Sequence, residues 1–551
     1  MVNYEPDVSQ LLALYQQLED DVIADMVRRI LKMGFVSETT AYQAELLQTA
    51  GLLYEDILQL IANRTDASVA QVRALFEDAG VQTVEIDNKS HEAAGEAPVD
   101  IRQDPGMKQV LEAGYRKTLG TMRNLVSTTA NATQTAFIQT CDRAYMQMSS
   151  GAFSYQEAIR SAVRQLADGG AYVYYPTGHR DRIDVAVRRC VLTGVGQTSA
   201  AVAKQHAEDA GCKYMELTAH GGARPEHAKW QGQLVVIQGE RTKAYIDGLK
   251  VFTLREIGYG DGSGFKGWNC RHNWHPYYPG LSTPNYTPEQ IKQLDAKTIA
   301  YNGEKYTEYE VSQMQRAGER KVRALKRRTL AAQEAVKSAP DKETKAVLQA
   351  DYAANAVKLK ESEKQLKTFC SQTGQRRDTF REQVDGFGRS ASQKAVHAAS
   401  EKKRLTIDWD SGKIDTEVFR KSIQKGYVKT KVEKNKQIKH TYNKQWKNQV
   451  KQAVQSFSNP DPKKRQTPRS VLRKDIDPQE IVSKYGGTGR LSLSDDGKTM
   501  NEYIELPEVI GKTFDKKIGR YVDTKTVQIK YSKGGTHVIP TIRKSAKKEG
   551  K

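Results

Sequence analysis

The chain has 551 residues, of which 38% are hydrophobic and 28% are charged, and it carries a formal net charge of +20. No apolar run approaches the roughly 20 residues that a membrane-spanning helix needs, so we expect no membrane span. The five cysteines are scattered and odd in number, which argues against a disulfide framework and for a reducing compartment. The first residues lack a basic segment before an apolar core, so we expect no secretory signal.

The charge is distributed unevenly along the chain. Residues 1–100 contain 18 acidic and 6 basic side chains, a balance of −12, so the remaining residues carry +32. Such asymmetry is typical of a protein whose acidic end meets a basic partner and whose basic end meets nucleic acid or another acidic surface. A solvated surface without a specific partner is the alternative.

Residues 1–87 predict an acidic helical domain made of short helices. Apolar side chains recur at three- and four-residue steps and form one stripe of a helix. The stripe consists of Leu11, Leu14, Leu18, Val22, Met26, Ile30 and Met33. Two further segments repeat the pattern and close at Gly51 and Gly80. Residues 88–106 are polar and lack periodicity, which predicts a linker.

Residues 107–290 predict a second domain that begins with helices and ends in a small α+β core. We expect the core around residues 215–280, where glycine-rich and aromatic segments surround the strand-like runs QLVVIQ and KVFTL. Because helices dominate on both sides of this core, the predicted fold class is multidomain and mainly α.

Residues 291–457 predict a charged, basic helical arm. Long helices with polar faces are expected across residues 285–460, either as extended helices or as a coiled-coil hairpin. Residues 401–470 hold 19 Lys and Arg against 7 Asp and Glu. Such a segment can neutralise phosphates, which makes packaged DNA a candidate partner. A soluble spacer is the alternative interpretation of the arm.

The end of the chain changes character again. Residues 458–480 include a proline-containing stretch that breaks helices, which predicts a linker. Across residues 481–551 apolar and polar residues alternate in short runs, which are separated by the turn signals DDGK and SKGG. This alternation predicts a separate, small, β-rich α+β module.

Two short windows concentrate residues that can bind metal or act as catalysts. LTAHGGARPEHAKW supplies His220 and His227, and NCRH supplies Cys270 and His272. Zinc takes four nitrogen or sulfur ligands in a tetrahedron, and these four side chains are candidates for a structural zinc site. Two alternatives stay open: the side chains fill space around the nearby tryptophans, or Cys270 and a histidine form a hydrolase pair.

These windows, together with GVGQTSAA before them and the closing YYPG, resemble the phage minor capsid protein 2 family. That family is related to head-morphogenesis proteins of the Mu F type. The resemblance covers roughly residues 1–290, and its sharp motifs lie within residues 194–280. It implies a virion protein near the portal that contacts portal or other capsid proteins, with no enzymatic role for residues 1–460. It also implies the host bacterial cytoplasm as the location during assembly.

Residues 486–541, which end in IKYSKGGTHVIPT, are similar to the polymorphic toxin type 50 group. That group is predicted to be ribonuclease-like, on the small sheet fold that barnase and colicin-type ribonucleases share. The resemblance implies RNA as a substrate and an immunity protein as a partner.

Metal-independent RNA cleavage needs a base and an acid that titrate near neutral pH and a cation beside the phosphate. His537 is the candidate for proton transfer, because an unperturbed histidine has a pKa of about 6.5. The side chains expected to hold the phosphate or to donate to it are Lys530, Lys533, Thr536 and Arg490. His537 is the one histidine of the predicted module. The second proton-transfer group is therefore expected to be Glu, Tyr or Lys.

Two interpretations of the whole chain follow. The first is a phage minor capsid protein that carries a C-terminal ribonuclease-type toxin domain and requires no cofactor, apart from the candidate structural zinc. The second is a purely structural and DNA-binding virion protein, in which the C-terminal module binds a partner or nucleic acid without catalysis.

Overall fold

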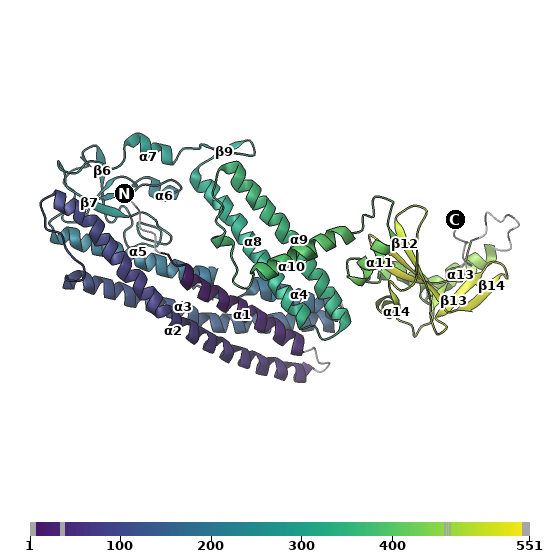
Figure 1. Cartoon of the computed structure of the whole chain (residues 1–551). Coiled ribbons are helices and arrows are strands. Elements are labelled where there is room, and N and C mark those ends of the chain that lie inside the picture. Colours follow the sequence, from purple (N-terminus) through teal and green to yellow (C-terminus); the bar gives the residue numbers. More distant parts are fainter. Residues whose placement is uncertain are drawn as a thin grey trace. The chain divides into compact units, whose positions relative to one another are not determined.

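The computed structural model describes residues 7–33, 39–151, 153–456, 459, 461, 464 and 466–542. The chain divides into two compact units, the first made of residues 1–338 with 358–393 and the second of residues 339–357 with 394–551. Figure 1 labels the elements of both units. The two units are described separately.

Long helices form the body of the first unit (Figure 1). These helices are α1 (Ser9–Met33), α2 (Thr39–Ala93), α3 (Pro105–Ser149), α4 (Tyr155–Gly169) and α5 (Ile183–Asp209). Helix α2 packs against α1, α3 and α5, and α3 also packs against α4. Helix α3 begins where Asp104 accepts a 2.7 Å hydrogen bond from the backbone N–H of Met107, directly before a proline that favours the first helical turn.

The acidic N-terminal residues are helical, as predicted, but they form longer helices and lie in the same compact unit as residues 107–290. Gly80 does not close a helix, because it lies inside α2. A Cβ atom at Gly80 would stand 2.8 Å from the Leu111 side chain, so this glycine lets α3 approach. Glycine has a low helix propensity, but close packing against a neighbouring helix can offset this loss of stability.

Part of the acidic charge at the start of the chain meets basic charge within the same unit. The carboxylate of Glu19 is fully buried and pairs with Arg182 and with Arg327, whose Nη2 lies 2.5 Å from Glu19 Oε2. Asp184 pairs with Arg323 next to them. Burial opposes ionisation of Asp184, but the three arginines together hold its pKa below the ordinary value. A charge network of this kind keeps the first turn of α5 against α1 and against the later helix α8 (Glu308–Lys337).

The predicted α+β core is a five-stranded sheet with the order β5-β6-β4-β3-β7. Its strands are β3 (Tyr214–Leu217), β4 (Leu234–Val236), β5 (Tyr245–Ile246), β6 (Leu249–Thr253) and β7 (Trp274–Tyr277). Strands β4 and β6 run parallel, and the other pairs run antiparallel. The aromatic rings of Trp230, Phe265 and Trp274 pack with aliphatic side chains in its core. Short helices α6 (Pro225–Ala228) and α7 (Pro288–Leu294) flank the sheet.

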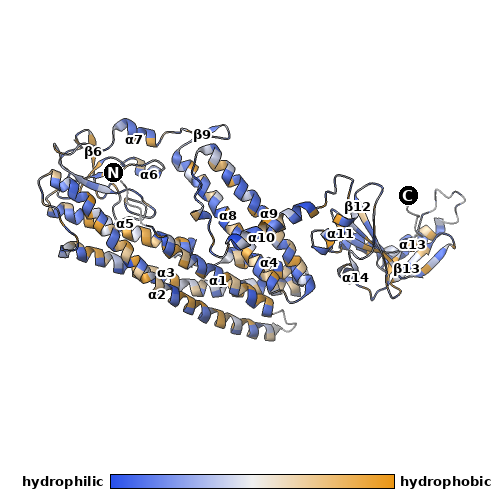
Figure 2. Cartoon of the chain, viewed as in Figure 1, coloured by the Kyte–Doolittle hydropathy of each residue, from blue (hydrophilic) through white to orange (hydrophobic). Residues whose placement is uncertain are grey.

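Two small hairpins, one long charged helix and the second part of another complete the first unit, whereas residues 342–357 of that last helix belong to the second unit. The hairpins are β1 (Tyr172–Tyr174) with β2 (Arg180–Arg182) and β8 (Ile299–Tyr301) with β9 (Glu304–Tyr306). The helices α8 (Glu308–Lys337) and α9 (Lys342–Thr373) form the predicted hairpin and share a small core that includes Val322, Leu325, Leu359 and Leu366. Hydrophilic and hydrophobic residues alternate along the long helices (Figure 2). Among the described residues, the helices are too short or too polar to cross a membrane.

The second unit combines short helices with two antiparallel sheets. The helices are α10 (Arg389–Leu405, of which residues 389–393 belong to the first unit), α11 (Thr416–Gln424), α12 (Lys434–Gln437), η2 (Ile438–His440), α13 (Lys444–Ser456) and α14 (Pro478–Tyr485). The short helix η1 (Phe380–Glu382) belongs to the first unit. The strands are β10 (Val471–Leu472), β11 (Arg490–Leu493), β12 (Thr499–Glu505), β13 (Gly511–Asp515), β14 (Arg520–Thr524), β15 (Thr526–Ser532) and β16 (Gly535–Pro540). One sheet has the order β11-β12-β15-β16 and the other has the order β10-β13-β14.

The core of this unit includes residues that the sequence placed in the arm and the linker. Phe419 and Ile423 of α11 pack in one cluster with Met500, Ile529 and other strand residues of the four-stranded sheet. Strand β10, which lies in the predicted linker, pairs with β13. The arm and the β-rich module are therefore not separated at residues 458–480. Lysines interrupt the apolar residues of this stretch, so its composition predicts a solvated arm rather than a part of a β-sheet core.

Candidate functional site

The fold brings the two His/Cys windows together at one end of the five-stranded sheet. Strand β3 pairs with β7, and Leu217 lies opposite Trp274. The loop that leaves β3 at Leu217 and the loop that enters β7 at Trp274 therefore start from the same end of neighbouring strands. The first loop carries His220 and His227. The second loop carries Cys270 and His272, so residues about fifty positions apart become neighbours.

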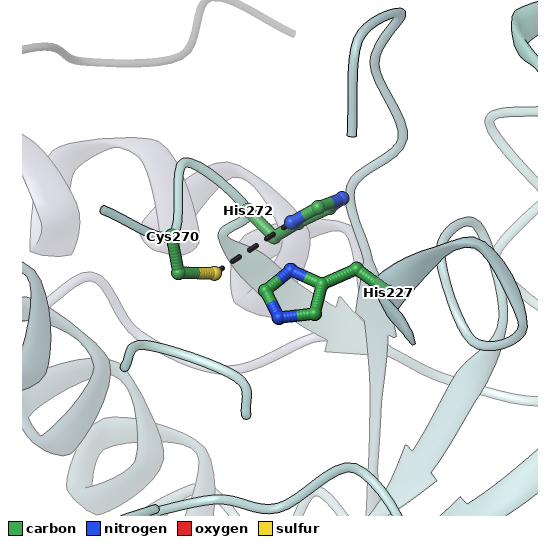
Figure 3. A group of neighbouring side chains, drawn as sticks. All are labelled: His227, Cys270 and His272. Carbon is green, nitrogen blue, oxygen red and sulfur yellow. Dashed lines mark hydrogen bonds between the residues drawn. The ribbon is translucent and has the colours of Figure 1, made fainter. Parts of the chain in front are cut away.

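His227, Cys270 and His272 converge on one point (Figure 3). Their possible ligand atoms all lie within 4.8 Å of one another, and Cys270 Sγ is 3.6 Å from His272 Nδ1. His220 stands beside this group, with its ring centroid 4.3 Å from that of His272. The structure thus brings the ligand atoms of three of the four predicted metal-ligand candidates together, with the His220 ring beside them, and we call these four residues the His/Cys cluster.

In each imidazole of the His/Cys cluster, one ring nitrogen lies within hydrogen-bond distance of a protein oxygen. His227 Nε2 lies 2.8 Å from the carbonyl oxygen of Ser263, and His272 Nε2 lies 3.3 Å from Gln231 Oε1. His220 Nδ1 lies 2.9 Å from the carbonyl oxygen of the next residue. The other nitrogen of His220, Nε2, is buried and has no hydrogen-bond partner among the described residues.

Burial disfavours the charged forms of His227 and His272. His227 is 2% exposed and His272 is 1% exposed. Burial lowers the pKa of both, and for His272 burial and the neighbouring histidines lower it to about 2. A cysteine hydrolase needs a thiolate beside an imidazolium, which these lowered pKa values oppose. The geometry therefore favours a metal site or neutral packing over a Cys270 nucleophile.

His275, the remaining histidine of the two windows, is not part of the cluster. Its Nδ1 lies 3.2 Å from Oδ1 of Asp87 on helix α2. Burial raises the pKa of Asp87, and the ion pair with His275 works in the opposite direction. This contact joins the sheet to the helical body of the first unit, which is a structural role.

A second candidate site lies on one face of the four-stranded sheet. The pairing register aligns Asn501, Lys530 and His537 across β12, β15 and β16. Alternation along the strands puts these three side chains on the face opposite the apolar core. Arg490 lies on the same face, at the β11 edge of the sheet. Three of the five predicted catalytic residues, Arg490, Lys530 and His537, therefore lie on the same face of the sheet.

A second histidine reaches this face from the segment that the sequence assigned to the arm. The ring of His440, at the end of η2, stacks against that of His537 with a centroid distance of 6.1 Å and an interplanar angle of 18°. His440 Nδ1 lies 3.1 Å from the carbonyl oxygen of Ser470. His537 Nδ1 is buried and has no hydrogen-bond partner among the described residues. We call His440 and His537 the histidine pair.

Positive charge surrounds the histidine pair. Burial, followed in order of size by the charges of His440, Lys530, Lys436 and Lys439, lowers the pKa of His537 to about 4. Burial also lowers the pKa of His440; its contact with the Ser470 carbonyl works in the opposite direction, and Arg469, Lys530 and Lys439 add to the lowering. Both rings are therefore neutral at pH 7 in the free protein, and the site attracts anions.

Two predicted catalytic residues lie elsewhere. Thr536 is fully buried on the opposite side of β16, where its hydroxyl donates a 2.6 Å hydrogen bond to the carbonyl oxygen of Lys429. Its proton is thus engaged in joining β16 to the preceding segment. Lys533 lies in the turn between β15 and β16, where its exposed ammonium is 2.7 Å from Asp410 Oδ2. The geometry therefore assigns Thr536 a structural role and leaves Lys533 at the rim.

Glu502 and Tyr531 also lie on the core side of the sheet. The Tyr531 hydroxyl donates a 2.6 Å hydrogen bond to Glu502, whose carboxylate also accepts from the backbone N–H groups of Gly487 and Gly489. This carboxylate is fully buried, so it fixes the loop before β11. The sequence missed His440 because it lies among lysines outside the predicted module. The apolar Val428 and Val432, which alternate with polar residues in GYVKTKV, were the available signal of sheet contact.

Comparisons with known proteins agree with this division of the chain. The model of the phage minor capsid protein 2 family matches residues 4–371, and the model of the bacterial toxin 50 domain matches residues 421–540. A protein named "Structural protein" from Lactococcus phage LL-H is 23% identical over 342 residues, which are 59% of this chain and 87% of that protein. A protein of the same name from Lactococcus phage mv4 is 38% identical over 81 residues, which are 15% of this chain and 57% of that protein.

No solved structure matches the chain. The first family model covers more than half of the 551 residues. The chain therefore belongs to the phage minor capsid protein 2 family, and it contains a bacterial toxin domain in its C-terminal part.

Proposed function

We propose that this member of the phage minor capsid protein 2 family is a virion protein whose C-terminal toxin domain is a metal-independent ribonuclease with His440 and His537 as its proton-transfer pair. The observation that carries the proposal is the orphaned Nδ1 of His537, which is buried beside a second histidine and several lysines. An unsatisfied buried nitrogen costs roughly 1–3 kcal/mol. Such a cost is typical of a group kept for a ligand or for catalysis.

The proposed reaction needs only the two histidines and the RNA. Neutral His537 removes the proton of a ribose 2′-hydroxyl, and the 2′-oxygen forms a bond to the adjacent phosphorus. The bond between phosphorus and the 5′-oxygen breaks, and protonated His440 gives its proton to that oxygen. The products are a 2′,3′-cyclic phosphate and a 5′-hydroxyl. Proton transfer by positioned side chains of this kind typically contributes 10²–10⁴-fold to a rate.

The surroundings of the pair suit this chemistry. Ser470 accepts from Nδ1 of His440, which leaves Nε2 of that ring as the nitrogen that exchanges protons. Lys530 is aligned with His537 in the register and places a cation beside the transferred phosphoryl charge. A phosphate bound here would offset the lysine charges that lower the pKa values of both rings. Protonated His440 would then become accessible in the complex with substrate.

The virion part of the proposal rests on the family and on the two phage structural proteins that resemble the chain. We infer a position near the portal and contacts with portal or other capsid proteins. A toxin domain in a virion protein requires protection of the host bacterium during assembly, so we infer an immunity protein that covers the histidine pair. The basic residues 401–470 are available for contact with packaged DNA or with the RNA substrate.

The test uses the purified full-length chain and a short single-stranded RNA, with EDTA present. We expect cleavage that yields a 2′,3′-cyclic phosphate, no cleavage of the same oligonucleotide with 2′-deoxyribose throughout, and loss of cleavage in His537→Ala. His397→Ala is the matched control, because His397 is exposed on α10 and far along the sequence from the site. Tight binding of intact RNA without cleavage would contradict the enzyme and support a nucleic-acid-binding module instead.

A further inference from the structure

We propose that the His/Cys cluster of the first unit is a structural zinc site, with Cys270 Sγ, His227 Nδ1 and His272 Nδ1 as ligands and His220 Nε2 as the fourth. The three convergent side chains in Figure 3 come from two loops that leave the same end of β3 and β7. This inference is independent of the proposed ribonuclease, because it concerns a different unit of the chain.

The hydrogen bonds of the outer nitrogens favour metal binding by the inner ones. His227 Nε2 and His272 Nε2 lie next to a carbonyl and an amide oxygen, so each of these nitrogens carries the ring proton. The Nδ1 atoms of both rings then have free lone pairs. Zinc-bound histidines commonly donate their second N–H to an oxygen of the protein in this way, which fixes the tautomer and the ring orientation.

In His220 the two ring nitrogens exchange roles, because Nδ1 rather than Nε2 contacts a protein oxygen. Its Nδ1 lies 2.9 Å from a backbone carbonyl oxygen, so its Nε2 carries the lone pair. That Nε2 atom is buried and has no hydrogen-bond partner among the described residues. The ring lies against that of His272. A metal ion bound beside the two rings would satisfy this nitrogen, which neutral packing leaves without a partner.

The distance between two of the donors matches zinc, and the third donor, on His227, lies within 4.8 Å of both. Zinc–nitrogen bonds of about 2.0–2.1 Å and zinc–sulfur bonds of about 2.3 Å put neighbouring donors of a tetrahedron roughly 3.3–3.7 Å apart. The distance of 3.6 Å between Cys270 Sγ and His272 Nδ1 lies in this range. Donors that are nitrogen and sulfur, with no carboxylate, favour zinc over calcium, magnesium or manganese.

The burial of the site points to a structural metal. His227 and His272 are 2% and 1% exposed, so a substrate has no direct access to a metal between them. Four protein ligands also leave no open position for water, as in other structural zinc sites. Such an ion would join residues 220–227 to residues 270–272 and hold both loops against the aromatic core of the sheet.

The first measurement is the metal content of the full-length chain purified without chelators. We expect about one zinc per chain, which a nitrogen and sulfur site of this kind retains through purification. Cobalt(II) introduced in place of zinc should give the intense visible bands of tetrahedral coordination and a thiolate-to-cobalt charge-transfer band. Less than about a tenth of a zinc per chain, together with no cobalt charge-transfer band, would overturn the proposal.

Two variants locate the ion. Cys270→Ser should lose the charge-transfer band and most of the bound zinc, whereas Cys212→Ser should keep both, because Cys212 lies in the same core and contacts backbone carbonyl oxygens instead. If Cys270→Ser does not fold, His220→Ala decides. It should keep the charge-transfer band while the visible cobalt bands change with the loss of one ligand. A band that survives in folded Cys270→Ser, or cobalt spectra that His220→Ala leaves unchanged, would contradict the assigned ligands.

Discussion

The His/Cys cluster and the histidine pair are both groups of buried or partly buried imidazoles, but their surroundings differ. In the cluster, each ring has an oxygen acceptor for one nitrogen, and the inner donors face a thiol. In the pair, the orphaned nitrogen of His537 faces lysines and a second ring on an exposed sheet face. Imidazole side chains therefore form a site suited to a cation in one unit and a site suited to an anion in the other. The difference comes from the charges and donor atoms that surround them.

The comparison predicts that the two sites fail independently. His537→Ala should lower the rate of RNA cleavage by about 10²–10⁴-fold, because it removes a proton-transfer group. The zinc content of the same variant should remain that of the wild-type chain. Both quantities are measured on one preparation, by an RNA cleavage assay and by elemental analysis. Loss of zinc together with cleavage would show that the variant disturbs the whole chain.

The charge around the histidine pair can be tested with Lys530→Met, which keeps the length of the side chain and removes its ammonium. We expect cleavage to slow by about 10²-fold, the usual effect of removing one group that stabilises transition-state charge. Lys533→Met is the matched control, because Lys533 pairs with Asp410 in the hairpin turn. Equal losses in both variants would indicate general attraction of RNA rather than a specific contact at Lys530.

Removal of the proposed zinc should affect stability and leave chemistry intact. A ligand at a thousand times its Kd stabilises a folded protein by about 4 kcal/mol. A strong chelator should therefore lower the melting temperature of the first unit by several degrees, while RNA cleavage below that temperature continues at the same rate. Calorimetry and the cleavage assay in the presence of the chelator check this. A melting curve that the chelator does not move would argue for neutral packing of the His/Cys cluster.

The pH dependence of kcat/KM reports the two histidines in the free protein. His537 must be neutral to act as the base, so kcat/KM should rise with pH through its pKa of about 4. His440 must be protonated to act as the acid, so kcat/KM should fall as pH rises through a pKa that burial holds below the ordinary value of 6.5. We expect a bell with its maximum between these limits. A maximum well above pH 7 would be incompatible with this assignment.

The smallest effect is expected at Thr536. Thr536→Val removes the partly buried hydrogen bond to the Lys429 carbonyl, which should destabilise the second unit by about 0.5–1.5 kcal/mol, the usual net contribution of one hydrogen bond. The rate of cleavage at a temperature where the variant is folded should change little. Urea denaturation and the cleavage assay measure the two quantities. A loss of cleavage without a loss of stability would contradict the structural role and indicate that Thr536 takes part in catalysis.

The sequence was sufficient for local structure and for the His/Cys cluster. The strands after residue 485 follow alternation of apolar and polar residues, and the long helices follow three- and four-residue spacing. His220, His227, Cys270 and His272 were predicted together because both windows are dense in ligand residues. The structure adds that their strands are neighbours in the sheet.

The histidine pair was not predictable in the same way. His440 follows a lysine-rich stretch whose composition is that of a solvated helix, and only the contact of α12 and η2 with β16 brings it to His537. The internal partners of the acidic N-terminus were hidden for a similar reason. Glu19 and Arg327 are more than 300 positions apart in the sequence, and no local pattern links them.

The most direct test of the account is the rate of RNA cleavage by full-length His440→Ala beside His397→Ala and the wild-type chain. His440 entered the site through the fold alone, so its effect tests both the packing of the second unit and the proposed chemistry. The account predicts a loss of about 10²–10⁴-fold for His440→Ala and none for His397→Ala. Full cleavage by a folded His440→Ala chain would contradict the histidine pair as the centre of this toxin domain.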